Sequence, residues 1–196
     1  AIALLRALVQ QDSINPPGVT KGVAGVALGW LRTAGFAPEV VSAHPNKPNI
    51  VVTLDNGPGP HLVFNAHLDT ISPGEPSAWT RPIHDLTEGG GRLYGLGTGN
   101  MKAAAAAMML ATLNLSARRD DWTGRLSLTL VADECVFGPD GAAFLLSQRP
   151  DCLRHSVAHQ PSGDQRRQPW EHLRLTKLGH FPEKWEARVR DLARVL

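Results

Sequence analysis

Two polar residues suited to chemistry stand at the end of an apolar run. The run HLVFNA at 61–66 leads into His67 and, two residues later, Asp69. Side chains alternate between the two faces of a strand, so His67 and Asp69 point the same way if the run is a strand. A carboxylate beside an imidazole fixes the tautomer of the ring and raises its basicity, as happens behind metal-bound histidines. Taken alone, such a pair is more typical of a structural histidine.

A second polar residue, Asn100, precedes an alanine-rich run. The sequence MKAAAAAMMLATLNL is apolar nearly all round and predicts a buried helix over 101–115. The connection 71–93, rich in Pro, Gly and Ser, separates this region from His67. A connection of that length inside a compact domain is usually functional or disordered. Its place directly after a predicted strand is where α/β sheets carry their sites.

Other candidate residues also follow predicted strands. Glu134 and Cys135 come soon after the run RLSLTLVA, which predicts a strand over 125–132. Gln160 follows a weaker predicted strand at 155–158. Glu134, Cys135 and Gln160 are therefore expected near the ends of predicted strands.

The elements that must position these residues alternate along the chain. Apolar spacing predicts helices over 1–11, 20–34, 101–115 and 140–147. Strands are predicted over 38–42, 49–54, 61–66, 125–132 and 155–158. This alternation predicts an α/β fold, a three-layer domain with a largely parallel mixed sheet flanked by helices. One further strand over 171–178 and a helix over 183–196 begin what we interpret as a second unit.

Composition narrows the class of protein without naming a function. The 196 residues carry a net charge of +2, and the basic residues near the end alternate with acidic ones, so neither nucleic acid nor membrane is an expected partner. No apolar run reaches membrane-spanning length, and no signal peptide is visible. Two cysteines, Cys135 and Cys152, fit a reducing compartment, and we expect a cytoplasmic protein. The chain begins at Ala1 rather than at methionine, which suggests a piece of a longer protein.

Six segments, taken in order, carry a resemblance to a known family. They are SINPPG at 13–18, AHLDT at 66–70 with PG at 73–74 and Trp79, LYGLGTGNMK at 93–102, ADE at 132–134, GPDGA at 138–142 and QPSG at 160–163. Their order and spacing resemble the zinc-dependent exopeptidase and amidohydrolase family of acetylornithine deacetylase, succinyl-diaminopimelate desuccinylase, aminoacylase and glutamate carboxypeptidase. The resemblance implies a catalytic domain over 1–163, incomplete at its C-terminal end. It also implies, over 164–196, a linker and the beginning of a truncated α+β lid domain.

The same resemblance implies a reaction. Members of the family hydrolyse amide bonds of N-acyl amino acids or small peptides, using two zinc ions joined by a carboxylate and a water. Zinc lowers the pKa of its bound water to about 7, and a glutamate carries the proton of that water to the leaving amine. Position by position, His67 matches the first histidine ligand, Asp69 the carboxylate that orients it, and Glu134 the general base.

Three ligand positions of the family are substituted in this chain. Asn100 stands at the bridging aspartate, Cys135 at one glutamate ligand and Gln160 at another. The family's final histidine ligand lies beyond the lid, which this chain does not reach. Neutral amides cannot offset the repulsion of two dications, and Cys135 and His67 serve different metals in the family's arrangement. We therefore expect the two-zinc centre to be weak or absent, and catalysis to be impaired or lost.

Alternatives remain open for the chain and for single residues. The chain is an inactive relative that binds an acylated amino acid or peptide, an active metallohydrolase with a single-metal or non-standard site, or a fragment with no independent role. Without metal, Asn100 suits a helix N-cap and Cys135 a small buried hydrophobe. His180 matches a lid histidine that binds the substrate, although a surface histidine is the simpler interpretation. An incomplete sheet would expose an edge, which favours a homodimer or another association.

Overall fold

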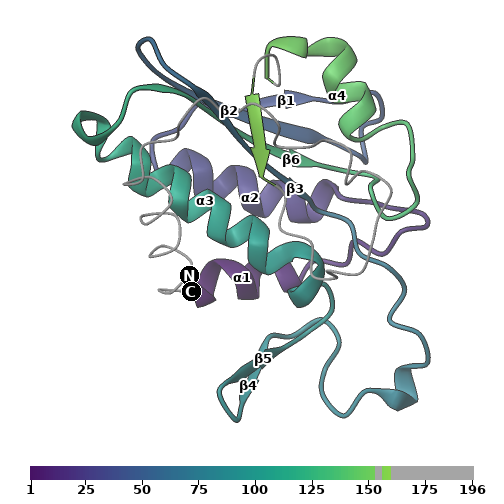
Figure 1. Ribbon diagram of the computed structural model, residues 1–196. Helices are drawn as coiled ribbons and strands as arrows, with labels where there is room; N and C mark the ends of the chain where they lie inside the picture. Colours follow the sequence, from purple (N-terminus) through teal and green to yellow (C-terminus); the bar gives the residue numbers. More distant parts are fainter. Residues whose placement is uncertain (153–155, 160–196) are drawn as a thin grey trace.

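A five-stranded sheet forms the centre of the domain (Figure 1). The computed structural model describes residues 1–152 and 156–159. The strands follow the spatial order β1-β2-β6-β3-β7. Their bounds are β1 Glu39–Val41, β2 Asn49–Asn56, β3 His61–His67, β6 Gly124–Val131 and β7 Ser156–His159. Each strand predicted from the sequence over these ranges is present.

The sheet is parallel on one side and antiparallel on the other. β3 runs parallel to both β6 and β7, with His67 opposite Val131. β2 is antiparallel to β1 and to β6. The mixed α/β fold is thus confirmed, whereas the parallel pairing expected for most of the sheet is confined to β6, β3 and β7. The carboxyl ends of the neighbouring parallel strands β3 and β6 lie side by side at the same end of the sheet. Open α/β sheets bind their ligands at this end of their strands.

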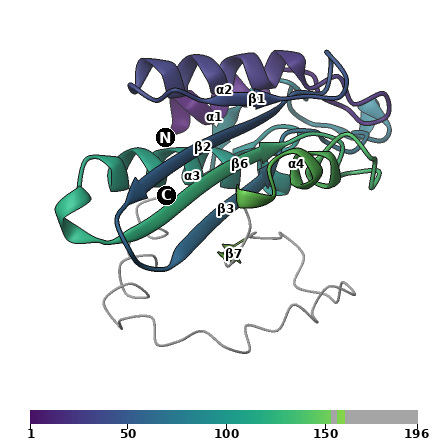
Figure 2. The ribbon, with the colours of Figure 1, turned by 90° about the horizontal axis from the view of Figure 1, so that it is seen from above.

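Helices cover both faces of the sheet, so the domain has the three predicted layers (Figure 2). The helices are α1 Ile2–Val9, α2 Lys21–Thr33, α3 Ala103–Ser116 and α4 Ala142–Gln148. Side chains of α1, α2 and α3 form the main core with those of one sheet face, where Leu126, Leu128 and Leu130 point. On the other face, Leu145 of α4 packs with Val131. Alternation along β6 therefore supplies an apolar side chain to each layer.

The connection after β3 contains a small hairpin that the sequence did not predict. β4 Thr87–Gly89 and β5 Arg92–Tyr94 pair antiparallel and project from the domain below α1 (Figure 1). Gly90 and Gly91 join them, both with positive φ, as a two-residue type I′ turn requires. The guanidinium of Arg81 lies 4.4 Å from the centre of the Tyr94 ring. Short 3-10 turns occur at Pro76–Ala78, Arg119–Asp121 and Pro150–Cys152.

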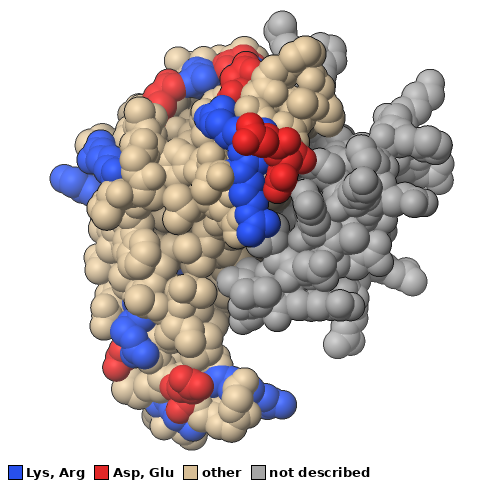
Figure 3. All heavy atoms as spheres, turned by 90° about the vertical axis from the view of Figure 1, so that its left-hand side faces the viewer, with Lys and Arg blue, Asp and Glu red and all other residues tan. Residues whose placement is uncertain are grey.

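Charges of both signs share the surface. On the face drawn in Figure 3, basic side chains lie beside acidic ones and form no large patch of one sign. Arg149 pairs with Glu39 and Asp151, and Arg125 pairs with Asp151 at 3.1 Å. Pairs of opposite charge such as these largely cancel each other's field at a distance. None of the described helices combines the length and the apolar character that crossing a membrane requires.

The start of β6 predicts an effect on stability. Gly124 has φ +109°, and a Cβ atom there would lie 2.2 Å from the main-chain oxygen of Pro60. We expect Gly124→Ala to destabilise the fold by more than about 1 kcal/mol, because neither the backbone angle nor the space admits a side chain. Gly25, in open space on α2, is the matched control, since Gly25→Ala should stabilise by about 0.5–1 kcal/mol. Urea unfolding of both variants checks this, and equal stability would contradict it.

Candidate functional site

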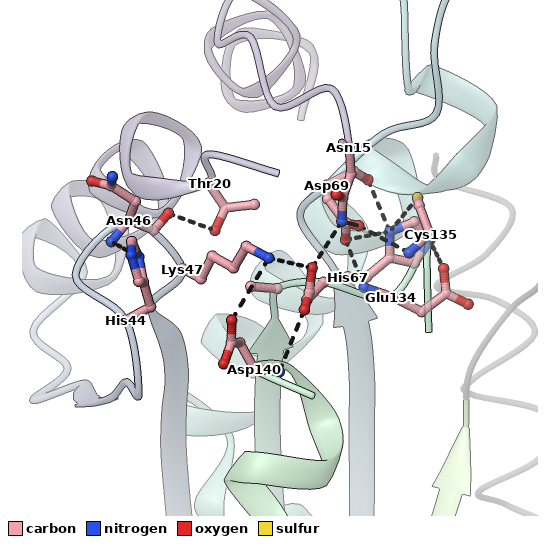
Figure 4. A network of polar contacts seen from close by, with 12 residues as sticks. Asn15, Thr20, His44, Asn46, Lys47, His67, Asp69, Glu134, Cys135 and Asp140 are labelled. Atoms are coloured by element: carbon pink, nitrogen blue, oxygen red, sulfur yellow. Dashed lines mark hydrogen bonds and ion pairs between the residues drawn. The ribbon is translucent and has the colours of Figure 1, made fainter. Parts of the chain in front are cut away.

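His67, the last residue of β3, lies at the centre of a buried polar network (Figure 4). Its side chain is 2% exposed. The Nδ1 nitrogen lies 2.9 Å from the main-chain oxygen of Asp69, which can only accept, so Nδ1–H donates to it. The other ring nitrogen, Nε2, lies 3.0 Å from Oδ1 of Asn100 and 3.3 Å from Oε2 of Glu134. The ring therefore turns Nε2 toward groups from two other segments.

The buried carboxylate of Asp69 fixes the surrounding residues. Oδ1 lies 3.4 Å from Nδ1 of His67 and accepts a hydrogen bond from the main-chain N–H of Glu134 at 3.2 Å. Oδ2 accepts from the main-chain N–H of Cys135 at 2.9 Å and from the side-chain amide of Asn15 at 2.8 Å. The structure thus places Asp69 behind His67, as the sequence suggested. The same carboxylate also holds the loop that follows β6.

The contacts of His67 and Asp69 set their charges. Burial would lower the pKa of His67, but Asp69, Cys135 and Glu134 outweigh this effect and raise the pKa to about 11. Burial would raise the pKa of Asp69, but His67, Asn15 and the N–H of Cys135 hold it well below its usual range. At neutral pH the pair is therefore an imidazolium beside a carboxylate, as long as no cation occupies Nε2.

Cys135 is not the buried hydrophobe that one interpretation expected. It is only partly buried, and its Sγ lies 3.9 Å from Nδ1 of His67. Burial raises the pKa of its thiol, and the contact with His67 opposes that shift. The expectation that Cys135 and His67 serve different metals stays a prediction, although the two side chains lie close together. Ligand atoms of His67, Glu134 and Cys135 lie within 4.8 Å of one another, the one such metal-capable group in the described part of the chain.

Asn100 does not cap the helix that follows it. α3 begins at Ala103, its N-cap position is Lys102, and no side chain caps it. Asn100 lies instead in the turn Thr98–Lys102, with extended backbone angles of φ −135° and ψ 96°. The N-cap interpretation is therefore wrong. The side chain is directed at Nε2 of His67, where the family resemblance implies a ligand.

Sequence reasoning missed three residues that extend the network. They are Asn15 and Lys47, which Figure 4 labels, and Asp133, which contacts both. The amide of Asn15 donates to Oδ1 of Asp133 at 3.1 Å, and Nζ of Lys47 donates to the same oxygen at 2.7 Å. Burial would raise the pKa of Asp133, but Lys47 and Asn15 keep it below its usual value. Asn15 and Asp133 lie inside segments that carry the family resemblance, so a signal for them existed. Lys47 had none, because it stands 86 residues from its partner.

Main-chain contacts hold Asn15 in this position. Its N–H donates to the oxygen of Thr70 at 2.7 Å, and the N–H of Thr70 donates to the oxygen of Ser13 at 2.9 Å. The segment before α2 is thereby attached to the end of β3. A Cβ atom at Gly18, whose φ is +73°, would lie 2.7 Å from the Asn15 side chain, so the tight turn at Gly18 leaves room for that amide.

The donors available for a metal can now be compared with those that the resemblance implies. The described residues supply the imidazole of His67, the carboxylate of Glu134, the thiol of Cys135 and the neutral amide oxygen of Asn100. Zinc accepts nitrogen, oxygen and sulfur donors of these kinds. The carboxylate of Glu134 and the thiolate of Cys135 together balance the charge of one dication. The charge of a second dication would remain uncompensated. Gln160, His180 and the predicted lid segment 164–196 lie outside the described residues, and their roles stay predictions.

Comparisons with known proteins agree with the resemblance. Succinyl-diaminopimelate desuccinylase of Methylobacterium radiotolerans is 34% identical over 163 residues, which are 78% of this chain and 41% of that enzyme. An M20 family metallo-carboxypeptidase from Sulfolobus solfataricus shares the fold, with a TM-score of 0.67, 16% identity, and coverage of 82% of this chain and 37% of that one.

A third similar protein is the Bacillus subtilis YXEP protein, described as a dinuclear metal binding peptidase from the M20 family. It matches with a TM-score of 0.52 and 15% identity, over 80% of this chain and 40% of that one. The chain spans less than half the length of the curated relatives it matches, 44% and 41% in two cases. Residues 63–170 match peptidase family M20/M25/M40. The chain therefore belongs to the peptidase family M20/M25/M40.

Proposed function

We propose that the chain is the catalytic portion of an amide hydrolase for N-acyl amino acids or small peptides, and that its hydrolytic activity is impaired or lost. The reaction class follows from the family and from relatives named as desuccinylases. The impairment follows from the substituted metal ligands. We take active relatives to hold two zinc ions, and the B. subtilis protein, described as a dinuclear metal binding peptidase, supports the number of metals.

The observation that carries the proposal is the position of Asn100. Its Oδ1 lies 3.0 Å from Nε2 of His67, and the sequence resemblance matches Asn100 to the bridging carboxylate of the family. Two dications about 4 Å apart repel by on the order of 15 kcal/mol at an effective dielectric constant near 20. A bridging carboxylate offsets much of this repulsion, whereas an amide contributes a carbonyl oxygen without charge.

Glu134, which matches the general base of the family, cannot by itself replace the missing two-metal centre. Its carboxylate lies 3.3 Å from Nε2 of His67, and its side chain is 39% exposed. As a base it would need a metal-bound water beside it, since an unbound water has a pKa near 15.7. In the absence of any metal, Glu134 instead lies beside the protonated ring of His67.

The test is metal content together with hydrolysis. The purified chain should hold fewer than two zinc ions and should not cleave N-acetyl or N-succinyl amino acids above background. The triple reversion Asn100→Asp, Cys135→Glu and Gln160→Glu should raise metal uptake, because it returns three negative ligands. Asn114→Asp is the matched control, since it adds one negative charge about three turns along α3 from the site. Two tightly bound zinc ions with turnover in the unaltered chain would overturn the proposal.

A further inference from the structure

The three-residue group of His67, Glu134 and Cys135 is spaced for a different centre from the one its family implies. We infer that these residues bind a single thiophilic divalent cation, with zinc as the expected metal, through one nitrogen, one oxygen and one sulfur. The inference rests on the proposed function for the loss of the two-metal centre, and it states what the site does instead. Geometry, charge and rigidity each support it.

The distances are close to those of a metal site. Zinc ligand bonds of 2.0–2.3 Å in a tetrahedron place a nitrogen and an oxygen about 3.3 Å apart, and a nitrogen and a sulfur about 3.6 Å apart. Nε2 of His67 lies 3.3 Å from Oε2 of Glu134, and the whole group fits within 4.8 Å. Sγ of Cys135 lies nearer to Nδ1 than the arrangement needs. Binding at Nε2 therefore requires the side chain of Cys135, which is only partly buried, to turn toward that nitrogen.

The charges of the ligands match one divalent cation, and the sulfur ligand favours a soft metal such as zinc. A thiolate and a carboxylate together offset a single dication, and His67 binds as neutral imidazole. Binding forms bonds from the metal to Sγ, Nε2 and the carboxylate, and the protons displaced from Sγ and Nε2 pass to solvent. Thiolate and imidazole ligands select zinc over magnesium, calcium or manganese. The fourth position is open to Oδ1 of Asn100, 3.0 Å from Nε2, or to water.

Rigidity comes from Asp69, which touches all three members of the group. It accepts from the main-chain N–H groups of Glu134 and Cys135, and its main-chain oxygen holds Nδ1–H of His67. That last contact fixes the tautomer with its lone pair on Nε2, the atom that faces the other donors. A carboxylate behind a ligating histidine is the usual outer partner of a zinc site. The donors therefore need only side-chain rotation to close on a cation.

The experiment titrates the metal-free full chain with Co²⁺, a coloured substitute for Zn²⁺. We expect one equivalent to bind and to produce a near-ultraviolet thiolate-to-cobalt charge-transfer band. Cys135→Ser should abolish the band and weaken zinc binding by more than about tenfold. Cys152→Ser should leave both unchanged, because Cys152 is fully buried beneath α4 in a separate cluster. Circular dichroism should confirm that both variants are folded.

Alkylation of the unaltered chain gives a second measurement that needs no variant. Zinc should protect Cys135 from iodoacetamide, read by peptide mass, whereas magnesium should not. One equivalent without the band, no binding at all, or no protection would overturn the inference while leaving the proposed loss of the two-metal centre intact. Two equivalents would overturn both, so the two failures are distinguishable.

Discussion

Asp69→Asn is expected to be the most destabilising of the conservative changes in the site. The substituted amide places an NH₂ group where the carboxylate now accepts from Asn15, Glu134 and Cys135 and forms an ion pair with His67. Removing one partner of a buried ion pair costs about 3–5 kcal/mol. Because the pKa of Asp69 is held below its usual value, its stabilising contribution is present above the unfolded pKa of 3.8 and is lost as the pH falls further.

Urea unfolding at pH 7 measures the effect of Asp69→Asn. Asp55→Asn is the matched control, since Asp55 is exposed and its carboxylate accepts only from the N–H of Gly57 among the contacts seen. The control should change stability by less than about 0.5 kcal/mol. A loss of less than about 1 kcal/mol in Asp69→Asn would show that the buried carboxylate is not what holds the network together.

Lys102→Met should change the pH dependence of stability at alkaline pH. The Lys102 side chain is fully buried before α3, and its Nζ donates to the main-chain oxygen of Gln11 at 2.8 Å. Burial lowers its pKa to about 8, with Asp12 opposing the shift, against 10.5 for a free lysine. The folded state thus disfavours the charged form. This cost in folding free energy is fully present below pH 8, and it disappears as the pH rises to 10.5.

The size of this effect follows from linkage. A shift from 10.5 to about 8 corresponds to on the order of 3 kcal/mol. The unaltered chain should therefore gain stability relative to Lys102→Met between pH 8 and 10.5. At pH 7 the variant should be of similar stability, because it loses the penalty but also leaves the oxygen of Gln11 without its donor. His67 has a raised pKa, so its own contribution to stability falls over the same pH range. Both proteins contain His67, so this contribution cancels when their stabilities are compared.

Thermal unfolding from pH 7 to 10.5 checks the Lys102 prediction. Lys21→Met serves as control, because Lys21 is exposed at the start of α2. The control should stay parallel to the unaltered chain over the whole range. Parallel curves for Lys102→Met would contradict the prediction, since they would mean that Lys102 keeps the same proton in the folded and unfolded states.

The sequence predicted the parts of the fold that depend on local pattern. β3 and β6 are long apolar runs, and α3 is rich in alanine, so chain composition alone indicated them. The hairpin of β4 and β5 was missed because strands of three residues carry too little alternation to detect. The bounds of the longer elements were close to those observed, since apolar periodicity and burial agree there.

The sequence pointed to several of the residues that meet at the candidate site, but it did not predict the contacts between them. His67, Asp69, Glu134 and Cys135 come together because β3 and β6 are neighbours, which the strand pattern made plausible. Asn100 was misjudged as a cap, because local preference for asparagine at helix starts competed with a long-range contact to His67. Such contacts depend on tertiary structure, and spacing along one chain does not reveal them.

The attachment of Asn15 to the strand ends has a kinetic consequence. Its bonds to Asp69 and Asp133 close loops of 54 and 118 residues, and Lys47 closes one of 86. Closing loops of this length costs conformational entropy before the new bonds contribute any stabilisation. The network is therefore expected to form late in folding. Weakening it therefore speeds unfolding more than it slows refolding. The lifetime of the native state depends in this way on a segment that precedes the first strand.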